Sequence, residues 1–583
     1  MPENSVLVGD YLGCYGRMDF DAPEAQISYT CLPYPRRPQV GRTPCLAVQW
    51  LRPDPVAAAP PVPGPQERLL LTGVVNGPVS AAWARRITAA LKEGRYADLA
   101  EVPGRLSGCL VTPRKVFLFR SAAAPEALLY RRDGAVLRWS TDPADLFDGG
   151  VGDLDREALW RACRGDDVLV HPGLTPVLPG ELVVVDAAGT TRVAYDPIVP
   201  LDVPPRTSLA EYAELAYGLI VEAVRPYAGC GRVGILLSGG LDSSTVLAAL
   251  TDVGADVVAY HMATDDPLAD ESAYAKAVCE CFDVPFVPVQ TELGDGYLSQ
   301  EWTFPHPFVG YAFRWVQQLS ERVGQDGITF LTWGSDGDVV FGPLRYGLHD
   351  VLFGDLRPAE KAALCRGLVS SRWELPRVLR SVRRSSSLLE DYLPVGENAR
   401  SVDFLVPLPG VPDDGFVEEY SPKDHTMDLT CWWPRGVHRC SPLGDKQVRR
   451  LTARMPNAYR LLPHQGRMIS KPVLRLILSG RVPEQVWRRY GRLWQDSPHK
   501  RYAMTHPGVF AGLLGGPDSR LAAAGIVDPA RLTDVLREPA ALRRHSETLI
   551  CSAMTELFLR GLDRVAPEGR PAKGDHDVRA ALG

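Results

Sequence analysis

The stretch RVGILLSGGLDSSTVLAAL, residues 232–250, decides the fold of this chain. It opens with the apolar run RVGILL, which is typical of a buried strand, and it closes with the apolar spacing of a helix. Between the two stand the small residues SGGLDSS, 238–244. Glycines let a backbone come close to phosphate oxygens, and the N–H groups at a helix N-terminus point at a negative charge. The pattern predicts a loop that binds phosphate.

The composition of this loop indicates the reaction. It has neither the spacing nor the lysine of a Walker A loop, so γ-phosphoryl transfer is disfavoured and cleavage between the α- and β-phosphates of ATP is expected. Asp242 would repel a phosphate unless a cation lies between them, which predicts Mg²⁺ held by two carboxylates. The partner carboxylate is expected in the segment 332–342, which follows the third apolar run and contains Asp336 and Asp338, because strand ends gather at one edge of a sheet. A helix cap is the alternative role for Asp242.

The expected nucleotide site combines the loop with the ends of the first two strands and the turn after the third. Adenine is expected to contact the strand residues at 236, 237, 261 and 262. The alternative is that these four side chains only pack in the core. The full set is Leu236, Leu237, Ser238, Gly239, Gly240, Leu241, Asp242, Ser243, Ser244, His261, Met262 and Gly334.

Residues 206–566 have the pattern of an α/β domain with a helical C-terminal part. A helix is expected over 208–224, with Ser208 as its N-cap. Apolar strand runs then alternate with helical segments, which predicts a parallel sheet covered by helices. Beyond about residue 350 the pattern is mostly helical. The strand runs are 232–237, 256–264 and 328–334.

Residues 1–205 have a different pattern and are predicted to form a separate domain. Short apolar runs separated by Gly, Pro and Asp indicate strands, and one clear helix is expected at 81–94. The last residues, 567–583, are predicted to be a disordered tail. The strand runs are 69–75, 115–121, 135–140 and 181–187.

The bulk composition excludes several classes of protein. A chain of 583 residues is too long for one core, which stops growing at roughly 250–300 residues. No apolar run approaches the ~20 residues that cross a bilayer, and no signal peptide is evident, so a cytoplasmic protein is expected. The net charge of −6 gives no reason to expect nucleic acid as a partner, and the 12 cysteines lack zinc or redox spacing.

The loop resembles that of the ATP-pyrophosphatase superfamily, and within it the asparagine synthetase-like group. Asp338 falls where that group has its second acidic motif, counting back from Phe341 and Gly342. The resemblance implies an α+β N-terminal domain, an Ntn-glutaminase-like β-sandwich, followed by an α/β ATP-pyrophosphatase domain. It covers roughly residues 100–495, and its further matching segments are 171–186, 270–289, 441–448 and 470–489.

Two departures from the group narrow the expected function. Its glutamine-hydrolysing members carry cysteine as the second residue, where this sequence has Pro2, and the nearest cysteine is Cys14. The N-terminal domain therefore resembles a degenerate glutaminase, as in β-lactam synthetases, carbapenam synthetases and lasso peptide cyclases. The group also places tyrosine or glutamate where this chain has Ser335, and its catalytic lysine where this chain has Gly491. Arg492 and Lys500 are the candidates to supply that positive charge, and a solvated surface charge is the favoured alternative for each taken singly.

The implied activity is adenylation of a carboxylate by MgATP, followed by attack of an amine on the acyl-adenylate. A lasso peptide (macrolactam) cyclase is favoured. The arginine-rich stretch at 371–386 could hold an acidic peptide, and a solvated face is the favoured alternative for it. This would imply a leader-peptide recognition protein and a leader peptidase as partners. The alternatives are a small-molecule β-lactam or amide synthetase, an asparagine synthetase that uses ammonia, and a non-catalytic nucleotide-binding scaffold. tRNA-modifying adenylating enzymes have the same loop, but the acidic net charge of this chain argues against that class.

Overall fold

The computed structural model places most of the chain. It describes residues 6–8, 14–19, 28–31, 68–76, 81–102, 104–112, 114–124, 127–143, 146, 153–290, 297–298, 305–307, 313–342, 356–370, 404–406, 420–464, 467–489 and 497–565. Pro2, Arg492, the arginine-rich stretch at 371–386 and the tail at 567–583 lie outside these residues. Within them, no helix is both long and apolar enough to cross a membrane.

A five-stranded sheet forms the centre of the α/β part, and every strand pair in it is parallel. The three predicted strand runs are present, so the expected parallel sheet is confirmed. The chain runs from the central strand to one edge, then returns to the other side of the central strand, which creates a switch point there. In sheet order the strands are β14 (Phe286–Gln290), β13 (Val257–Ala263), β12 (Val233–Leu236), β15 (Phe330–Trp333) and β16 (His438–Cys440).

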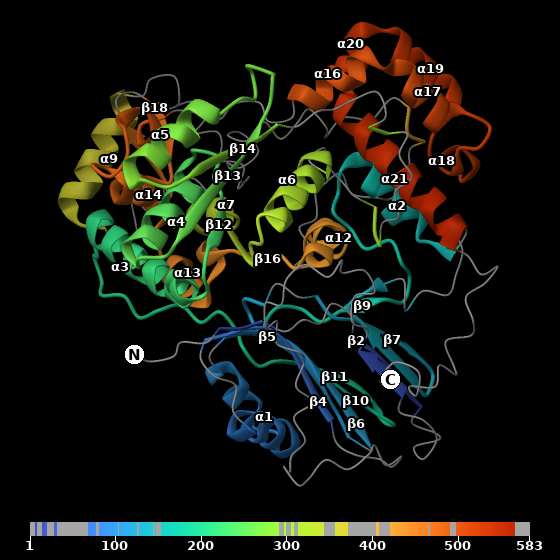
Figure 1. Cartoon of the computed structure of the whole chain (residues 1–583), viewed down its shortest axis with the longest axis horizontal. Helices are drawn as coiled ribbons and strands as arrows, with labels where there is room; N and C mark the ends of the chain where they lie inside the picture. The colour runs from blue at the N-terminus through green and yellow to red at the C-terminus, as the bar shows by residue number, and fades with distance from the viewer. Residues whose placement is uncertain are drawn as a thin grey trace.

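Helices cover both faces of this sheet, because its strands bury side chains alternately on each side. Val257 and Ala259 of β13 belong to one core, and Val258 and Tyr260 to another. Figure 1 shows the helices of the first core on the left of the sheet and α6 on its right. The first core includes α3 (Leu209–Val224), α4 (Leu241–Asp252), α5 (Ser272–Phe282) and α14 (Pro472–Leu478), and the second includes α6 (Phe313–Gln325) and η6 (Asp428–Trp432).

The helix expected over 208–224 begins as predicted. Ser208 is extended, its side chain accepts a hydrogen bond from the Glu211 amide, and the Glu211 carboxylate accepts one from the Ser208 amide. This reciprocal cap satisfies two backbone donors that a helix start otherwise leaves open.

The N-terminal part consists of two antiparallel sheets with a core between them (Figure 1). Leu118, Trp139 and Val183 come from both sheets and are fully buried in that core. Helix α1 (Ala81–Glu93) packs on the first sheet. One sheet has the order β1 (Val6–Val8), β4 (Arg68–Asn76), β5 (Gly104–Val111), β6 (Lys115–Arg120), β10 (Glu181–Asp186), β11 (Gly189–Ala194), and the other β3 (Ser28–Cys31), β2 (Cys14–Asp19), β8 (Val136–Ser140), β7 (Leu129–Asp133), β9 (Thr175–Pro176).

A helical cluster completes the described chain, at the upper right of Figure 1. It includes one helix from the N-terminal half, α2 (Arg156–Arg164), which packs against α21 (Ser546–Val565) and shares its core. Arg156 also donates hydrogen bonds to the carbonyls of Ala524 and Gly525. The domain boundary at 205 stays a prediction. The other helices of the cluster are α16 (Ser497–Thr505), α17 (Pro507–Gly515), α18 (Arg520–Ala523), α19 (Pro529–Arg537) and α20 (Pro539–Arg544).

Candidate nucleotide site

The phosphate-loop candidate turns directly from strand β12 into helix α4. Gly239 has a φ of +74°, and a Cβ there would stand 2.5 Å from the Ala275 amide nitrogen and 2.6 Å from the Tyr274 carbonyl carbon. Only glycine fits this close contact with the start of α5. Gly240 is the extended N-cap of α4, and no side chain caps that helix start. The loop thus presents the N-terminus of a twelve-residue helix at the carboxyl end of the central strand.

The serine side chains of the loop contact one another. The Ser238 and Ser243 hydroxyls are 3.2 Å apart, and the Gly240 amide donates to the Ser238 hydroxyl at 3.2 Å. The Ser243 and Ser244 side chains belong to buried residues at the start of α4. These contacts hold the loop in shape before any ligand is bound.

The two predicted aspartates meet at one ammonium group. The Nζ atom of Lys471 lies 2.5 Å from Asp242 Oδ2 and 2.7 Å from Asp338 Oδ1. Only 5% of the Lys471 side chain is exposed, against 15% for Asp242 and 57% for Asp338. The structure therefore brings together Asp242, Asp338 and a lysine that sequence reasoning missed.

Two glycines explain why the aspartates are so close. Strand β15 lies beside β12, and the turn after it packs against the first turn of α4. A Cβ on Gly334 would stand 2.5 Å from the Ser243 amide nitrogen and 2.8 Å from Asp242 Cβ. A Cβ on Gly337 would collide with the Asp242 carboxylate itself. The absence of side chains at these positions lets the two strand ends converge.

The turn that carries Asp338 is held by hydrogen bonds from a later part of the chain. Asp336 has a φ of +66°, a costly backbone conformation for a residue with a Cβ, and it precedes α7 (Gly337–Phe341). Its carboxylate accepts a hydrogen bond from Arg449 at 3.2 Å, on α13 (Lys446–Ala453). The Ser335 carbonyl accepts another from the Ser441 hydroxyl at 2.7 Å. The Ser441 bond comes from the segment 441–448 and the Arg449 bond from the residue that follows it, so this part of the chain supports the turn.

The N-terminal part contacts the same segment. Arg105 of β5 lies 3.6 Å from Asp445, whose side chain accepts a hydrogen bond from the Gln447 amide and so caps α13. Lys446 forms an ion pair with Asp196, whose carboxylate also accepts a bond from the Ala122 amide. A chain of polar contacts thus runs from the N-terminal sheets through α13 to Asp336.

The backbone around Lys471 is also constrained. Lys471 has a φ of +54° and is the N-cap of α14, and its amide donates to the Arg460 carbonyl at 2.9 Å. Further along, Arg475 donates to the carbonyls of Trp487 and Arg489. These bonds hold the backbone on both sides of the Lys471 side chain in place.

Arg489 joins this C-terminal segment to α5. It forms an ion pair with Glu271, and its guanidinium carbon lies 4.3 Å from the centre of the Tyr274 ring. Both side chains of the ion pair are largely buried. Because Tyr274 also touches Gly239, Arg489 supports the wall behind the loop.

The candidate adenine residues lie at the ends of β12 and β13. Leu237 is fully buried in the core beneath the sheet, whereas Leu236 and Met262 are partly buried. The His261 Nδ1 atom lies 2.7 Å from the Leu237 carbonyl oxygen, and burial lowers the pKa of His261, so the ring is neutral. Adenine contact stays a prediction for this set.

Of the two residues predicted to supply a catalytic positive charge, the structure describes only Lys500. Arg492 lies outside the described residues. Lys500 is partly buried on α16, and its neighbour Arg501 pairs at 2.8 Å with Asp265, just beyond the end of β13. Helix α16 therefore contacts the segment that follows the carboxyl end of β13. The role of Lys500 stays a prediction.

The metal prediction depends on the donors that the aspartates offer. The described part of the chain contains no group of three or more His, Cys, Asp or Glu side chains able to hold a metal ion. Two converging carboxylates nevertheless fit Mg²⁺, which takes one or two carboxylates together with substrate phosphates and water. Asp242 and Asp338 thus suit a metal that arrives with a nucleotide.

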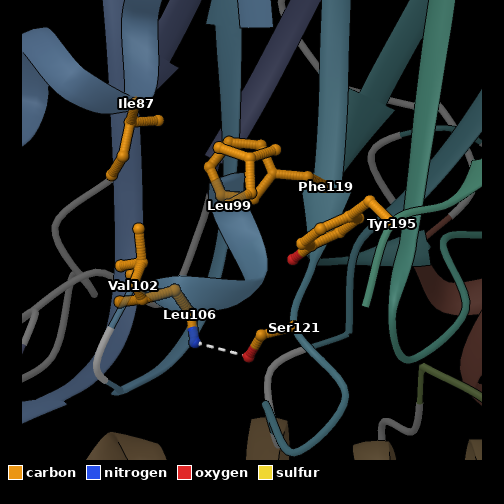
Figure 2. Close-up of a pocket in the computed structure, with 7 residues that line it drawn as sticks. All are labelled: Ile87, Leu99, Val102, Leu106, Phe119, Ser121 and Tyr195. Carbon is orange, nitrogen blue, oxygen red and sulfur yellow. Dashed lines mark hydrogen bonds between the residues drawn. The ribbon is translucent and has the colours of Figure 1, made fainter. Parts of the chain in front are cut away.

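A small apolar pocket elsewhere is too small to be a substrate site. It lies in the N-terminal part between α1 and the first sheet, and Figure 2 shows Tyr195 and Phe119 facing Ile87 across it. Its cavity volume of about 10 Å³ would hold about one water molecule. It is lined by Ile87, Leu99, Val102, Leu106, Phe119, Ser121 and Tyr195.

The strand–loop–helix with its paired aspartates agrees with the comparison to protein families. Residues 218–424 match the asparagine synthase family. This asparagine synthase region contains the loop, Asp242 and Asp338, and it ends before Lys471. The match supports an asparagine synthetase-like, ATP-dependent ligase that forms amide bonds. A search of curated proteins finds no match.

Two solved structures are similar to the chain in part. Glutamine phosphoribosylpyrophosphate amidotransferase from B. subtilis, complexed with ADP and GMP, is 9% identical over 48% of this chain and 63% of its own, with a TM-score of 0.17. An allosteric regulatory enzyme of purine biosynthesis is 12% identical over 49% of this chain and 56% of its own, with a TM-score of 0.16. The match spans less than two thirds of either structure.

Proposed function

We propose that the protein is a lasso peptide (macrolactam) cyclase, which joins the N-terminal amine of a peptide to a side-chain carboxylate at the expense of ATP. The observation that carries the ligase chemistry is the meeting of Asp242, Asp338 and Lys471 beside the glycine loop. The match to the asparagine synthase family supports the general reaction. The choice of peptide substrate is our own inference from the residue at position 335.

The first proposed step is adenylation. A carboxylate oxygen of the substrate attacks the α-phosphorus of ATP, a new P–O bond forms, and the bond to pyrophosphate breaks. Asp242 and Asp338 would hold Mg²⁺, which when bound neutralises charge on the phosphates. The backbone N–H groups of the loop and the N-terminus of α4 bind the outer phosphates, and Lys471 supplies positive charge beside them.

The second proposed step forms the amide. The neutral substrate amine attacks the acyl carbon, a C–N bond forms, the C–O bond to AMP breaks, and the proton of the amine passes to water. The same peptide carries both reacting groups, so holding it in a folded shape can supply much of the rate increase.

Position 335 favours a peptide N-terminus as the amine. Relatives place a tyrosine or a glutamate there, and Ser335 is not a comparable base. An α-amino group has an ordinary pKa of about 7.7–8.0, so a large share is neutral near pH 7.5 without a strong base, unlike an alkyl amine near 10. The missing base is therefore least costly for a peptide cyclase.

The test is to incubate the protein with MgATP and peptides that carry a free N-terminus and an internal Asp or Glu. A cyclase should release AMP and pyrophosphate and yield a product lighter by one water, and a leader-peptide recognition protein and leader peptidase should be needed when a longer precursor is supplied. An N-acetylated peptide is the matched control, since it should support pyrophosphate exchange without cyclisation.

Other outcomes would redirect the assignment. Exchange stimulated only by a short amino-acid derivative would indicate a β-lactam or amide synthetase, and turnover of aspartate with ammonia would indicate an asparagine synthetase. ADP as the by-product would overturn the adenylation chemistry, and nucleotide binding without turnover would indicate a scaffold.

A further inference from the structure

Lys471 occupies the position that a metal ion would be expected to take. Its ammonium lies within 2.7 Å of a carboxylate oxygen of each aspartate, and its side chain is 5% exposed. We propose that Lys471 is the counter-ion of the Asp242–Asp338 pair in the nucleotide-free protein and that a divalent metal ion replaces it when nucleotide binds. This inference rests on the proposed nucleotide-dependent function, and it adds a device that keeps the metal site closed until the nucleotide arrives.

Electrostatics makes the lysine and the metal competitors. Magnesium–oxygen distances are about 2.0–2.1 Å, so an ion bound to both carboxylates would need nearly the same space as Nζ. A lysine ammonium and a metal ion this close together would repel each other strongly in a partly buried site. The Lys471 ammonium offsets the repulsion between the two carboxylates, of which Asp242 is 15% exposed and Asp338 57%. The space between the two carboxylates therefore holds one cation at a time, and in this structure that cation is the Lys471 ammonium.

The side chain can leave the aspartates while the backbone stays in place. The Lys471 amide is bonded to the Arg460 carbonyl at 2.9 Å, and the residue caps α14 at a φ of +54°. A lysine carries its charge on a flexible four-carbon stem with several rotatable bonds. The displaced ammonium therefore remains near the loop, where the incoming phosphates are the new anions. Lys471 would then provide the positive charge that Gly491 cannot provide.

The first experiment measures binding of Mn²⁺ alone, without nucleotide, by electron paramagnetic resonance. Lys471→Met should bind Mn²⁺ about tenfold or more tightly than the natural protein, because the ion no longer has to displace an ammonium. Lys471→Arg keeps the charge and should exclude Mn²⁺ as the natural protein does. Lys115→Met is the matched control, since it removes a Lys–Asp ion pair with Asp186 in the N-terminal sheet and should change nothing. Equal Mn²⁺ affinity in Lys471→Met and the natural protein would overturn the proposal.

The second experiment begins with the natural protein, so its first result does not depend on whether Lys471→Met folds. Mn²⁺ uptake should be weak alone and should rise about tenfold or more when a non-hydrolysable ATP analogue is present, since metal and nucleotide then displace the lysine together. Tight Mn²⁺ binding without nucleotide would refute the idea. In Lys471→Met, affinity for the metal alone should rise while affinity for the metal–nucleotide complex falls. A loss of both affinities would show that the lysine is only structural.

These outcomes are separate from those of the cyclase assay. Failure to form AMP from any peptide would reject the proposed function but would leave the exchange of Lys471 for Mn²⁺ measurable. Conversely, an active cyclase whose metal affinity ignores position 471 would reject this inference alone.

Discussion

Gly334→Ala should inactivate the protein without removing any functional group. The added Cβ would stand 2.5 Å from the Ser243 amide nitrogen and 2.8 Å from Asp242 Cβ, whereas ordinary contacts lie at 3.4–4 Å. Relief requires the end of β15 and the start of α4 to separate by about 1 Å, a displacement that can cost about 100-fold in rate. Overpacking of this kind also destabilises a fold by about 1–3 kcal/mol. Gly334 does not have a positive φ, so backbone strain adds nothing to the effect.

The assay is AMP release at saturating MgATP, combined with thermal unfolding to separate lost activity from lost structure. Gly218→Ala is the matched control, because Gly218 lies on the exposed face of α3 and a Cβ there meets nothing within 4 Å. That variant should keep full activity and gain about 0.5–1 kcal/mol of stability. Full activity in Gly334→Ala would refute the argument that glycine contacts set the spacing of the two aspartates.

Three further predictions follow from the same structure. Asp242→Ala should abolish AMP release in the peptide assay, and full retained activity would exclude the site assignment. Arg449→Met should lower kcat about tenfold with little change in KM for ATP, since it loses one charge-assisted bond to Asp336 and should touch no substrate; an unchanged kcat would contradict the supporting role. Burial lowers the pKa of His171 to about 4 and that of His425 to about 3 from an ordinary 6.5, so both are neutral in the fold. Their contribution to stability is fully present above pH 6.5 and decreases toward pH 4 by roughly 1.4 kcal/mol per histidine per pH unit, because the unfolded chain binds more protons; equal urea midpoints at pH 7 and pH 5 would contradict this.

The central sheet shows what the sequence predicts and what it does not. Strands β12, β13 and β15 are apolar runs bounded by turn residues, so their pattern identifies them. Strand β16 contains only His438, Arg439 and Cys440, and it exists because β15 offers a free edge for pairing. Strand β14 includes Pro288, which suits an edge strand and weakens the sequence signal. Tertiary pairing forms these two strands.

The candidate site likewise contains residues that the sequence predicts and one that it does not. Asp242 and Asp338 follow strands that the sequence identifies, and parallel strands bring such residues to one edge. Lys471 lies more than 200 positions from Asp242, at a backbone conformation that sequence patterns rarely indicate. The spacing of the asparagine synthetase-like group predicts a cation at the position of Gly491, so it does not identify Lys471. The available signal was a lone lysine at the head of the apolar helix α14, inside the matching segment 470–489.

The packing of α2 on α21 has a practical consequence for dividing the chain. A fragment ended at residue 205 would present Trp160 and Cys163 to water, and the remaining fragment would lose the covering of its longest C-terminal helix. Neither fragment would keep the packing that it has in the whole chain. Removal of residues 1–205 would therefore uncover part of α21, so the N-terminal part stabilises the C-terminal helices whether or not it performs any chemistry.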